Sequence, residues 1–133
     1  MPRRSGWKQL IEEYPSFNRW YLNLARGSET TAQERARIIN RYLSHHNLTP
    51  TQLVENAKQD RRMVEDQLLD FVNHMHSLER SPGYIANYVK AVKSWLLFND
   101  IELVRRINVG NTGRTPSIED ERVPDKNELK QIL

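Results

Sequence analysis

The sequence contains no cysteine, which excludes a disulfide scaffold, thiolate catalysis and any zinc site built on thiolates. Long apolar runs are also missing, since none approaches the roughly 20 residues that a membrane-spanning helix needs. The basic first residues are followed by no apolar signal core, so we expect no secretion signal and no membrane partner. A chain of 133 residues can still bury a packed core without disulfides or metals. We therefore expect a soluble, cytoplasmic protein.

Motifs for catalysis and nucleotide binding are missing too. The segment 110–115 has two glycines but lacks the Gly-Lys-Ser/Thr ending of a phosphate loop, and no strand pattern precedes it. No G-x-S-x-G nucleophile elbow occurs, and the acidic runs at 12–13 and 119–121 fall in a terminal segment and in a linker. We therefore expect no catalytic residue, no cofactor, no small-molecule ligand and no enzyme activity within this chain.

Four histidines form two close pairs that suggest a metal site. His74 and His76 lie two residues apart on an expected helix, so their side chains point to nearly opposite sides. His45 and His46 are neighbours and diverge by about 100° around the helix axis. No H-E-x-x-H motif or third ligand lies nearby, so we expect no metal site and partly exposed histidines.

Apolar residues recur at three- and four-residue spacing almost throughout, which predicts an all-α domain. A first helix is expected between Pro15 and Gly27. A second begins at Thr31, whose hydroxyl would cap the helix while Glu34 reaches back to it, and frays near His46. The expected buried side chains of these two helices are Phe17, Trp20, Tyr21, Leu24, Ile38, Ile39, Tyr42 and Leu43.

Three further helices complete the expected bundle. Thr49, followed by Pro50 and by Gln52, is typical of the start of a short third helix. The fourth helix runs from Val64 to Leu78, and the fifth follows Ser81 and Pro82 and ends near Asn99. The acidic face of the fourth helix is expected to point to water, and it comprises Glu65, Asp66 and Asp70. Four large aromatic residues are assigned to the core: Trp20, Phe71, Trp95 and Phe98.

The helical periodicity stops after Arg106. Residues 108–124 combine glycine and proline with polar residues, which is typical of a linker. A new capping box, Asp125 with Glu128, then precedes a few apolar residues before the chain ends. We therefore expect a compact helical domain over 1–107, a linker over 108–124, and the first helix of a second, truncated domain over 125–133.

The net charge of +3 hides an uneven distribution. Residues 1–47 hold eight basic and four acidic side chains, whereas residues 48–79 hold three and six. Residues 80–109 are basic again, with five basic and two acidic side chains, and residues 110–133 hold four and five. Positive charge is therefore concentrated in two separated segments.

Two of the expected helices carry basic residues away from their apolar faces. The second presents Arg37 and Arg41, with His45 one turn further along. The fifth presents Asn87, Lys90 and Lys93, with Ser81 and Tyr84 at its amino end, where backbone amides can also meet phosphates. Exposed lysine and arginine are common, so solvated surface accounts for either helix alone. Together they favour a DNA-binding surface that comprises Arg37, Arg41, Ser81, Tyr84, Asn87, Lys90 and Lys93.

The order of several motifs resembles the phage-integrase type of tyrosine recombinases, in their amino-terminal core-binding, or SAM-like, domain. Ser28 with Thr30 and Thr31 is similar to the family's S-x-x-T helix start. The segment 81–98 is similar to its last helix, although Pro82-Gly83 departs from the pattern. The segment 121–133, with Pro124 followed by Glu128 and Leu129, is similar to the entry into the catalytic domain. The resemblance spans about Phe17 to Leu133.

This resemblance implies a SAM-like bundle of four to five helices that clamps double-stranded DNA together with a catalytic domain. Two helices of such a domain lie near the major groove, and other recombinase protomers on the DNA would be further partners. The family's catalytic arginines, lysine, histidines and tyrosine would fall downstream of Leu133, so no catalytic role is carried onto any of the five tyrosines. The expected function is DNA binding in site-specific integration and recombination.

A helical protein-interaction module without nucleic-acid binding is the alternative. It would use the same bundle, with the helix from Val64 to Leu78 or the apolar end from Leu129 to Leu133 docking another chain. Salt-sensitive binding to duplex DNA would separate the two hypotheses.

Overall fold

The computed structural model describes residues 6–110, and within them the regular structure is entirely α-helical. The all-α prediction is therefore confirmed, with six helices in this range where four to five were predicted. Along the chain they are α1 (Gly6–Glu13), α2 (Pro15–Gly27), α3 (Glu29–His46), α4 (Pro50–Gln59), α5 (Arg61–Ser77) and α6 (Pro82–Phe98).

The helix that sequence reasoning missed is α1. It is only eight residues long, and none of its side chains is fully buried, so its periodic signal is short and incomplete. Trp7, Leu10 and Ile11 nevertheless pack partly buried against the core. The Trp7 ring lies 5.7 Å from that of Tyr21 on α2, measured between centroids. Tertiary contact with α2 and α3 therefore holds a segment that an isolated peptide of this length would not keep helical.

Side-chain caps set most of the helix starts. The hydroxyl of Ser28 accepts a hydrogen bond from the Thr31 amide at 3.2 Å, so α3 begins at Glu29 and the prediction of Thr31 as the cap was wrong. Ser28 satisfies an amide of the first turn, which Thr31, already inside the helix, cannot do. The capping box of Thr49 and Gln52 and the Ser81 cap of α6 are confirmed.

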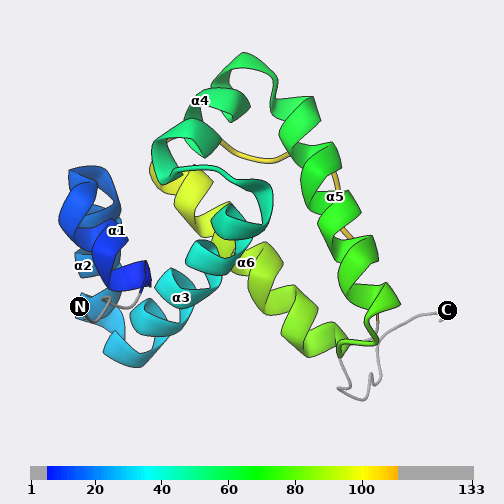
Figure 1. The fold of residues 1–133 in the computed structure, drawn as a ribbon, viewed down its shortest axis with the longest axis horizontal. Coiled ribbons are helices and arrows are strands. Elements are labelled where there is room, and N and C mark those ends of the chain that lie inside the picture. The colour runs from blue at the N-terminus through cyan, green and yellow to red at the C-terminus, as the bar shows by residue number, and fades with distance from the viewer. Residues whose placement is uncertain (1–5, 111–133) are drawn as a thin grey trace, which may run out of the picture.

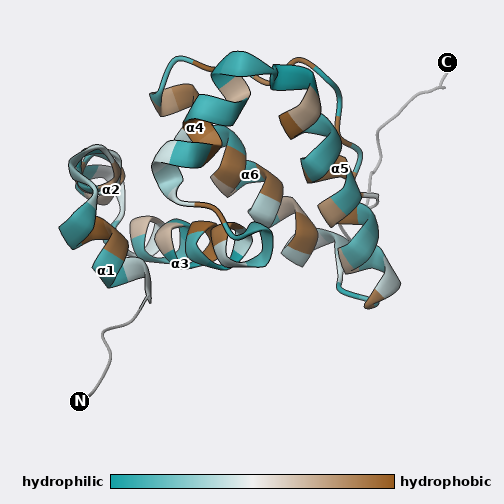
Figure 2. Ribbon diagram, turned by 45° about the horizontal axis from the view of Figure 1, so that its top comes forward, coloured by the Kyte–Doolittle hydropathy of each residue, from teal (hydrophilic) through white to brown (hydrophobic). Residues whose placement is uncertain are grey.

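The helices pack around α6, which lies between α3 and α5 (Figure 1). Helices α1 and α2 cover the other side of α3, and α4 contacts α5. Most hydrophobic positions of α3, α5 and α6 face the neighbouring helices (Figure 2). The indole nitrogens tie α6 to its neighbours, because Trp20 Nε1 donates to Ser94 Oγ at 3.1 Å and Trp95 Nε1 donates to the Pro50 carbonyl at 3.3 Å.

An aromatic cluster forms the centre of the core. The rings of Phe17, Trp20 and Trp95 lie 5.0–5.6 Å apart in tilted or edge-to-face pairs, an arrangement that aromatic quadrupoles favour. Phe71 is buried against Tyr42 and Tyr88. Phe98 was expected in the core but is 38% exposed, because it is the last residue of α6 and stacks on Trp95 from the end of the helix, with ring centroids 6.4 Å apart.

After α6 the chain returns along the bundle without forming a helix. Ile101 is buried, and Leu103, Ile107 and Val109 pack partly buried against the core. We call residues 101–109 the return segment. The predicted interdomain linker over 108–124 is described only for its first three residues, and the predicted helix start over 125–133 lies outside the described residues.

The return segment overturns one prediction about α5. Glu65 was expected to point to water with Asp66 and Asp70, but it is only 2% exposed, whereas the two aspartates are exposed. Its Oε2 accepts hydrogen bonds from the backbone amides of Val104 at 2.6 Å and Arg105 at 2.9 Å. The Arg61 guanidinium lies 3.6 Å from the same oxygen. A buried carboxylate is satisfied in this way by donors from a segment about 40 residues away.

Candidate nucleic-acid interface

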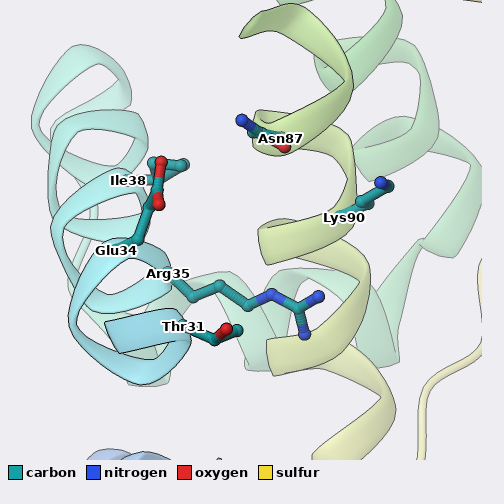
Figure 3. A pocket seen from close by; sticks show the side chains of 6 residues that line it. All are labelled: Thr31, Glu34, Arg35, Ile38, Asn87 and Lys90. Carbon is teal, nitrogen blue, oxygen red and sulfur yellow. The ribbon is translucent and has the colours of Figure 1, made fainter. Parts of the chain in front are cut away.

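A hollow between α3 and α6 brings side chains from the two basic segments together (Figure 3). Its volume is about 210 Å³, and its lining comprises Thr31, Glu34, Arg35 and Ile38 from α3 and Asn87 and Lys90 from α6. Asn87 projects from α6 toward α3, and the Arg35 guanidinium extends from α3 toward α6. The two basic segments of the sequence therefore meet across one depression.

A second hollow continues the first toward α2. It has a volume of about 490 Å³ and shares Arg35 and Lys90 with the first. Its other lining residues are Trp20, Asn23 and Leu24 from α2 and Lys93, Ser94, Leu97 and Phe98 from α6. Because the two hollows share two residues, we treat them as one depression and call it the α3–α6 groove.

The charge of the α3–α6 groove is predominantly positive. Arg35, Lys90 and Lys93 line it, against the single carboxylate of Glu34. Within residues 6–110, the side chains of these four residues and of Asn87 make no hydrogen bond or ion pair. Three cations on two helices, against one carboxylate and without an ion pair in this range, favour a polyanionic ligand.

A fourth cation, Arg41, lies beside the groove on α3. A hydrogen bond to the Tyr88 hydroxyl, with a further contribution from Tyr84, raises the pKa of the Arg41 guanidinium. The two tyrosine hydroxyls lie 3.4 Å apart. The Arg80 guanidinium lies over the Tyr84 ring, 5.7 Å from its centroid. Tyrosines of α6 therefore hold an α3 arginine in place while it remains exposed to solvent.

The structure groups some of the predicted DNA-binding residues and separates others. Asn87, Lys90 and Lys93 line the groove, and Arg41 meets Tyr84 beside it. Arg37 is exposed on α3 but does not line the groove. Ser81 uses its hydroxyl to cap α6 by accepting a hydrogen bond from the Tyr84 amide at 3.2 Å.

Sequence reasoning missed the groove residues Thr31, Glu34 and Arg35. The predicted DNA-facing side of α3 was placed opposite Ile38, Ile39 and Tyr42, which excludes residues near the edge of the apolar face. Arg35 lies one turn before Ile38 and Ile39 on that edge, and this position was the available signal. Its location opposite α6 depends on how the two helices cross.

Three histidines gather at the carboxyl ends of α3 and α5. The His45 ring lies 4.9 Å from that of His46 and 5.3 Å from that of His74, between centroids, so the expected divergence of His45 and His46 does not keep their rings apart. Burial, together with the charges of His46 and His74, lowers the pKa of His45. No group of three or more potential ligands in the described range is arranged to hold a metal ion.

The described helices include none that is long and apolar enough to cross a membrane. Comparison of the chain with protein-family models, with curated proteins and with solved structures found no match. The function therefore rests on the sequence motifs and on the geometry of the groove.

Proposed function

We propose that this chain binds double-stranded DNA through the α3–α6 groove, as the core-binding domain of a site-specific tyrosine recombinase or integrase. The observation that carries the DNA-binding proposal is the convergence of Arg35, Lys90 and Lys93 on one groove, where none of the three forms an ion pair with a described residue. Such cations release counterions when they neutralise DNA phosphates, which is the main source of affinity for duplex DNA.

The side chains of the groove would contact different parts of the DNA, according to their chemistry. Lysine and arginine contact phosphates and set the register of the protein on the duplex, whereas Asn87 has the donor and acceptor pair that reads an adenine edge. Arg41, held by Tyr84 and Tyr88, extends the phosphate-contacting surface beyond the groove. In the cytoplasm, this domain would clamp the duplex. Strand cleavage would be carried out by the catalytic domain of the recombinase.

The recombinase assignment has its support in the sequence. The S-x-x-T start of α3, the segment 81–98 and the proline entry at 121–133 occur in the order typical of that family. Coding sequence downstream of Leu133 tests this part of the proposal. An R…H-x-x-R…Tyr array there would support it, and its absence from an otherwise complete gene would leave a DNA-binding domain of another kind.

Salt-dependent binding to duplex DNA tests the groove itself. Lys90→Ala should weaken binding to all sequences and reduce the slope of log affinity against log salt by roughly one, because one phosphate contact is lost. Adding Lys93→Ala should reduce the slope by roughly two. Fluorescence anisotropy with a labelled duplex, at several salt concentrations, measures both quantities.

Lys58→Ala is the matched control, since Lys58 is an exposed lysine on α4 and does not line the groove. Its affinity and salt slope should equal those of the unmodified protein. If all variants bind alike, or if Lys58→Ala has the same effect as Lys90→Ala, the DNA-binding face lies elsewhere. Glu65→Ala is unsuitable as a control because Glu65 holds the return segment.

One observation favours the alternative of a protein-interaction module. Leu97 is 60% exposed and Phe98 is 38% exposed at the α2 end of the groove, so an apolar patch adjoins the cations. If duplex DNA fails to bind at low salt, this patch would become the favoured contact surface, for a helix of another protein. The anisotropy experiment therefore separates the two functions.

A further inference from the structure

The α3–α6 groove contains a carboxylate where a surface devoted only to phosphates would have none. Glu34 lines the first hollow together with Arg35 and Lys90, and its side chain has no hydrogen-bond or ion-pair partner within residues 6–110. Arg37 and Arg41 stand three and seven residues further along the same helix, yet neither forms an ion pair with it. The carboxylate is thus free to accept hydrogen bonds from a ligand.

A phosphate cannot be that ligand, because two negative charges in contact repel each other. Base edges in the major groove of DNA offer a suitable donor, the exocyclic amino group of cytosine, and glutamate is one of the side chains that accept from it. The Glu34 carboxylate would still be repelled by the phosphates near that base. Arg35 and Lys90 offset this repulsion, because they can neutralise the phosphates on either side of the base.

The surroundings of Glu34 fit a base edge rather than a sugar–phosphate strand. The apolar Ile38 lines the same hollow one turn after Glu34, and Asn87 projects toward α3 from α6 (Figure 3). Glu34 and Asn87 come from different helices, so together they can contact the edges of neighbouring base pairs. No other carboxylate lines the groove in the described range.

We propose that Glu34 is a specificity-determining residue that accepts a hydrogen bond from the amino group of a cytosine in the major groove. The inference rests on the proposed function, since it requires that the groove binds duplex DNA. It goes beyond that function by naming a base and the residue that reads it.

Enrichment of random duplexes by the unmodified protein, followed by anisotropy on single enriched duplexes, tests the inference. The enriched sequences should share a cytosine at one position, and replacing that C·G pair should weaken binding about 5- to 150-fold, the range expected for one base contact. Glu34→Gln should lose that preference at that position alone. It should also bind random duplexes more tightly, because a negative charge facing the phosphates has been removed.

Glu55→Gln is the matched control, because Glu55 is exposed on α4 and lies outside the groove. Its base preferences should equal those of the unmodified protein. If Glu34→Gln strengthens binding but keeps the cytosine preference, Glu34 acts only as a repulsive charge and the inference is wrong while the proposed function stands. If the unmodified protein binds no duplex at low salt, both are overturned.

Discussion

The hydroxyl of Tyr42 is a buried polar group without a partner. The side chain is fully buried on α3, and its Oη makes no hydrogen bond with any described residue. Burial raises the pKa of Tyr42, so the hydroxyl is protonated at neutral pH. Tyr88 offers the contrast, because its hydroxyl accepts from Arg41. The two tyrosines should therefore respond in opposite ways to loss of the hydroxyl.

We expect Tyr42→Phe to raise the free energy of unfolding by about 1 kcal/mol, because an unsatisfied hydroxyl is removed from the core. Tyr88→Phe should lower it by about 1 kcal/mol, because the Arg41 hydrogen bond is lost. Urea unfolding followed by circular dichroism measures both, with an unchanged m-value as the sign that only stability has changed. Destabilisation by Tyr42→Phe would show that a buried water satisfies the hydroxyl.

At the scale of the helix, start signals act through short hydrogen bonds within one turn. Ser28, Asp60 and Ser81 each accept a hydrogen bond from the backbone amide three residues later, and Thr49 does so within a capping box. Proline at the first position of α2, α4 and α6 adds a fixed backbone angle where no amide is required. These devices explain why several of the predicted helix starts agree with the structure.

Ser28 and Thr31 form a natural pair for testing which residue caps α3. Ser28→Ala should lower the free energy of unfolding by about 1 kcal/mol, because an amide of the first turn loses its acceptor. Thr31→Ala should change it by less than about 0.5 kcal/mol, since its side chain is exposed and does not cap. Thermal or urea unfolding of the two variants measures these changes. A larger decrease in the free energy of unfolding for Thr31→Ala than for Ser28→Ala would show that Thr31 caps α3.

For the whole molecule, the contact between Glu65 and the return segment links α5 to the chain that follows α6. Burial alone would raise the pKa of Glu65, but the amides of Arg105 and Val104 and the charges of Arg61 and Arg105 outweigh it and leave that pKa below its ordinary value. An ion pair between Arg105 and Asp66 lies beside this contact. The folded state therefore favours the ionised form of Glu65, which makes this contact dependent on pH.

Glu65→Ala should lower the free energy of unfolding by about 1–3 kcal/mol at neutral pH, because the amides of Val104 and Arg105 lose their acceptor. The contribution of Glu65 is present above the ordinary glutamate pKa of about 4.3 and is lost as the pH falls through its lower pKa in the folded state. The difference between the variant and the unmodified protein should therefore shrink below about pH 4.

Urea unfolding at a series of pH values between neutral and acid measures this difference. Asp70→Ala is the control, because Asp70 is exposed on the same helix and does not contact the return segment through any described hydrogen bond or ion pair. A difference that grows as the pH falls would mean that Glu65 is protonated in the folded protein, and would contradict the ionised contact.

The sequence by itself determined the features that depend on near neighbours along the chain. The all-α class, the Thr49–Gln52 capping box, the Ser81 cap and the buried faces around Trp20 and Trp95 follow from residues within one or two turns of each other. The helical phase of α6 alone also placed Asn87, Lys90 and Lys93 away from its apolar face, and all three line the groove, while their contact with DNA stays a prediction.

Only the tertiary structure decided which faces of different helices meet. Glu65 shares a face of α5 with the buried Leu68 and Val72, but the donors that satisfy its carboxylate come from a segment 39 residues away that no local pattern connects to it. Arg35 and Glu34 belong to the groove because α3 crosses α6 there, and α1 is helical because α2 and α3 cover it. Local propensity specifies the helices, whereas the burial of apolar surface between distant segments sets how they pack and therefore where the groove forms.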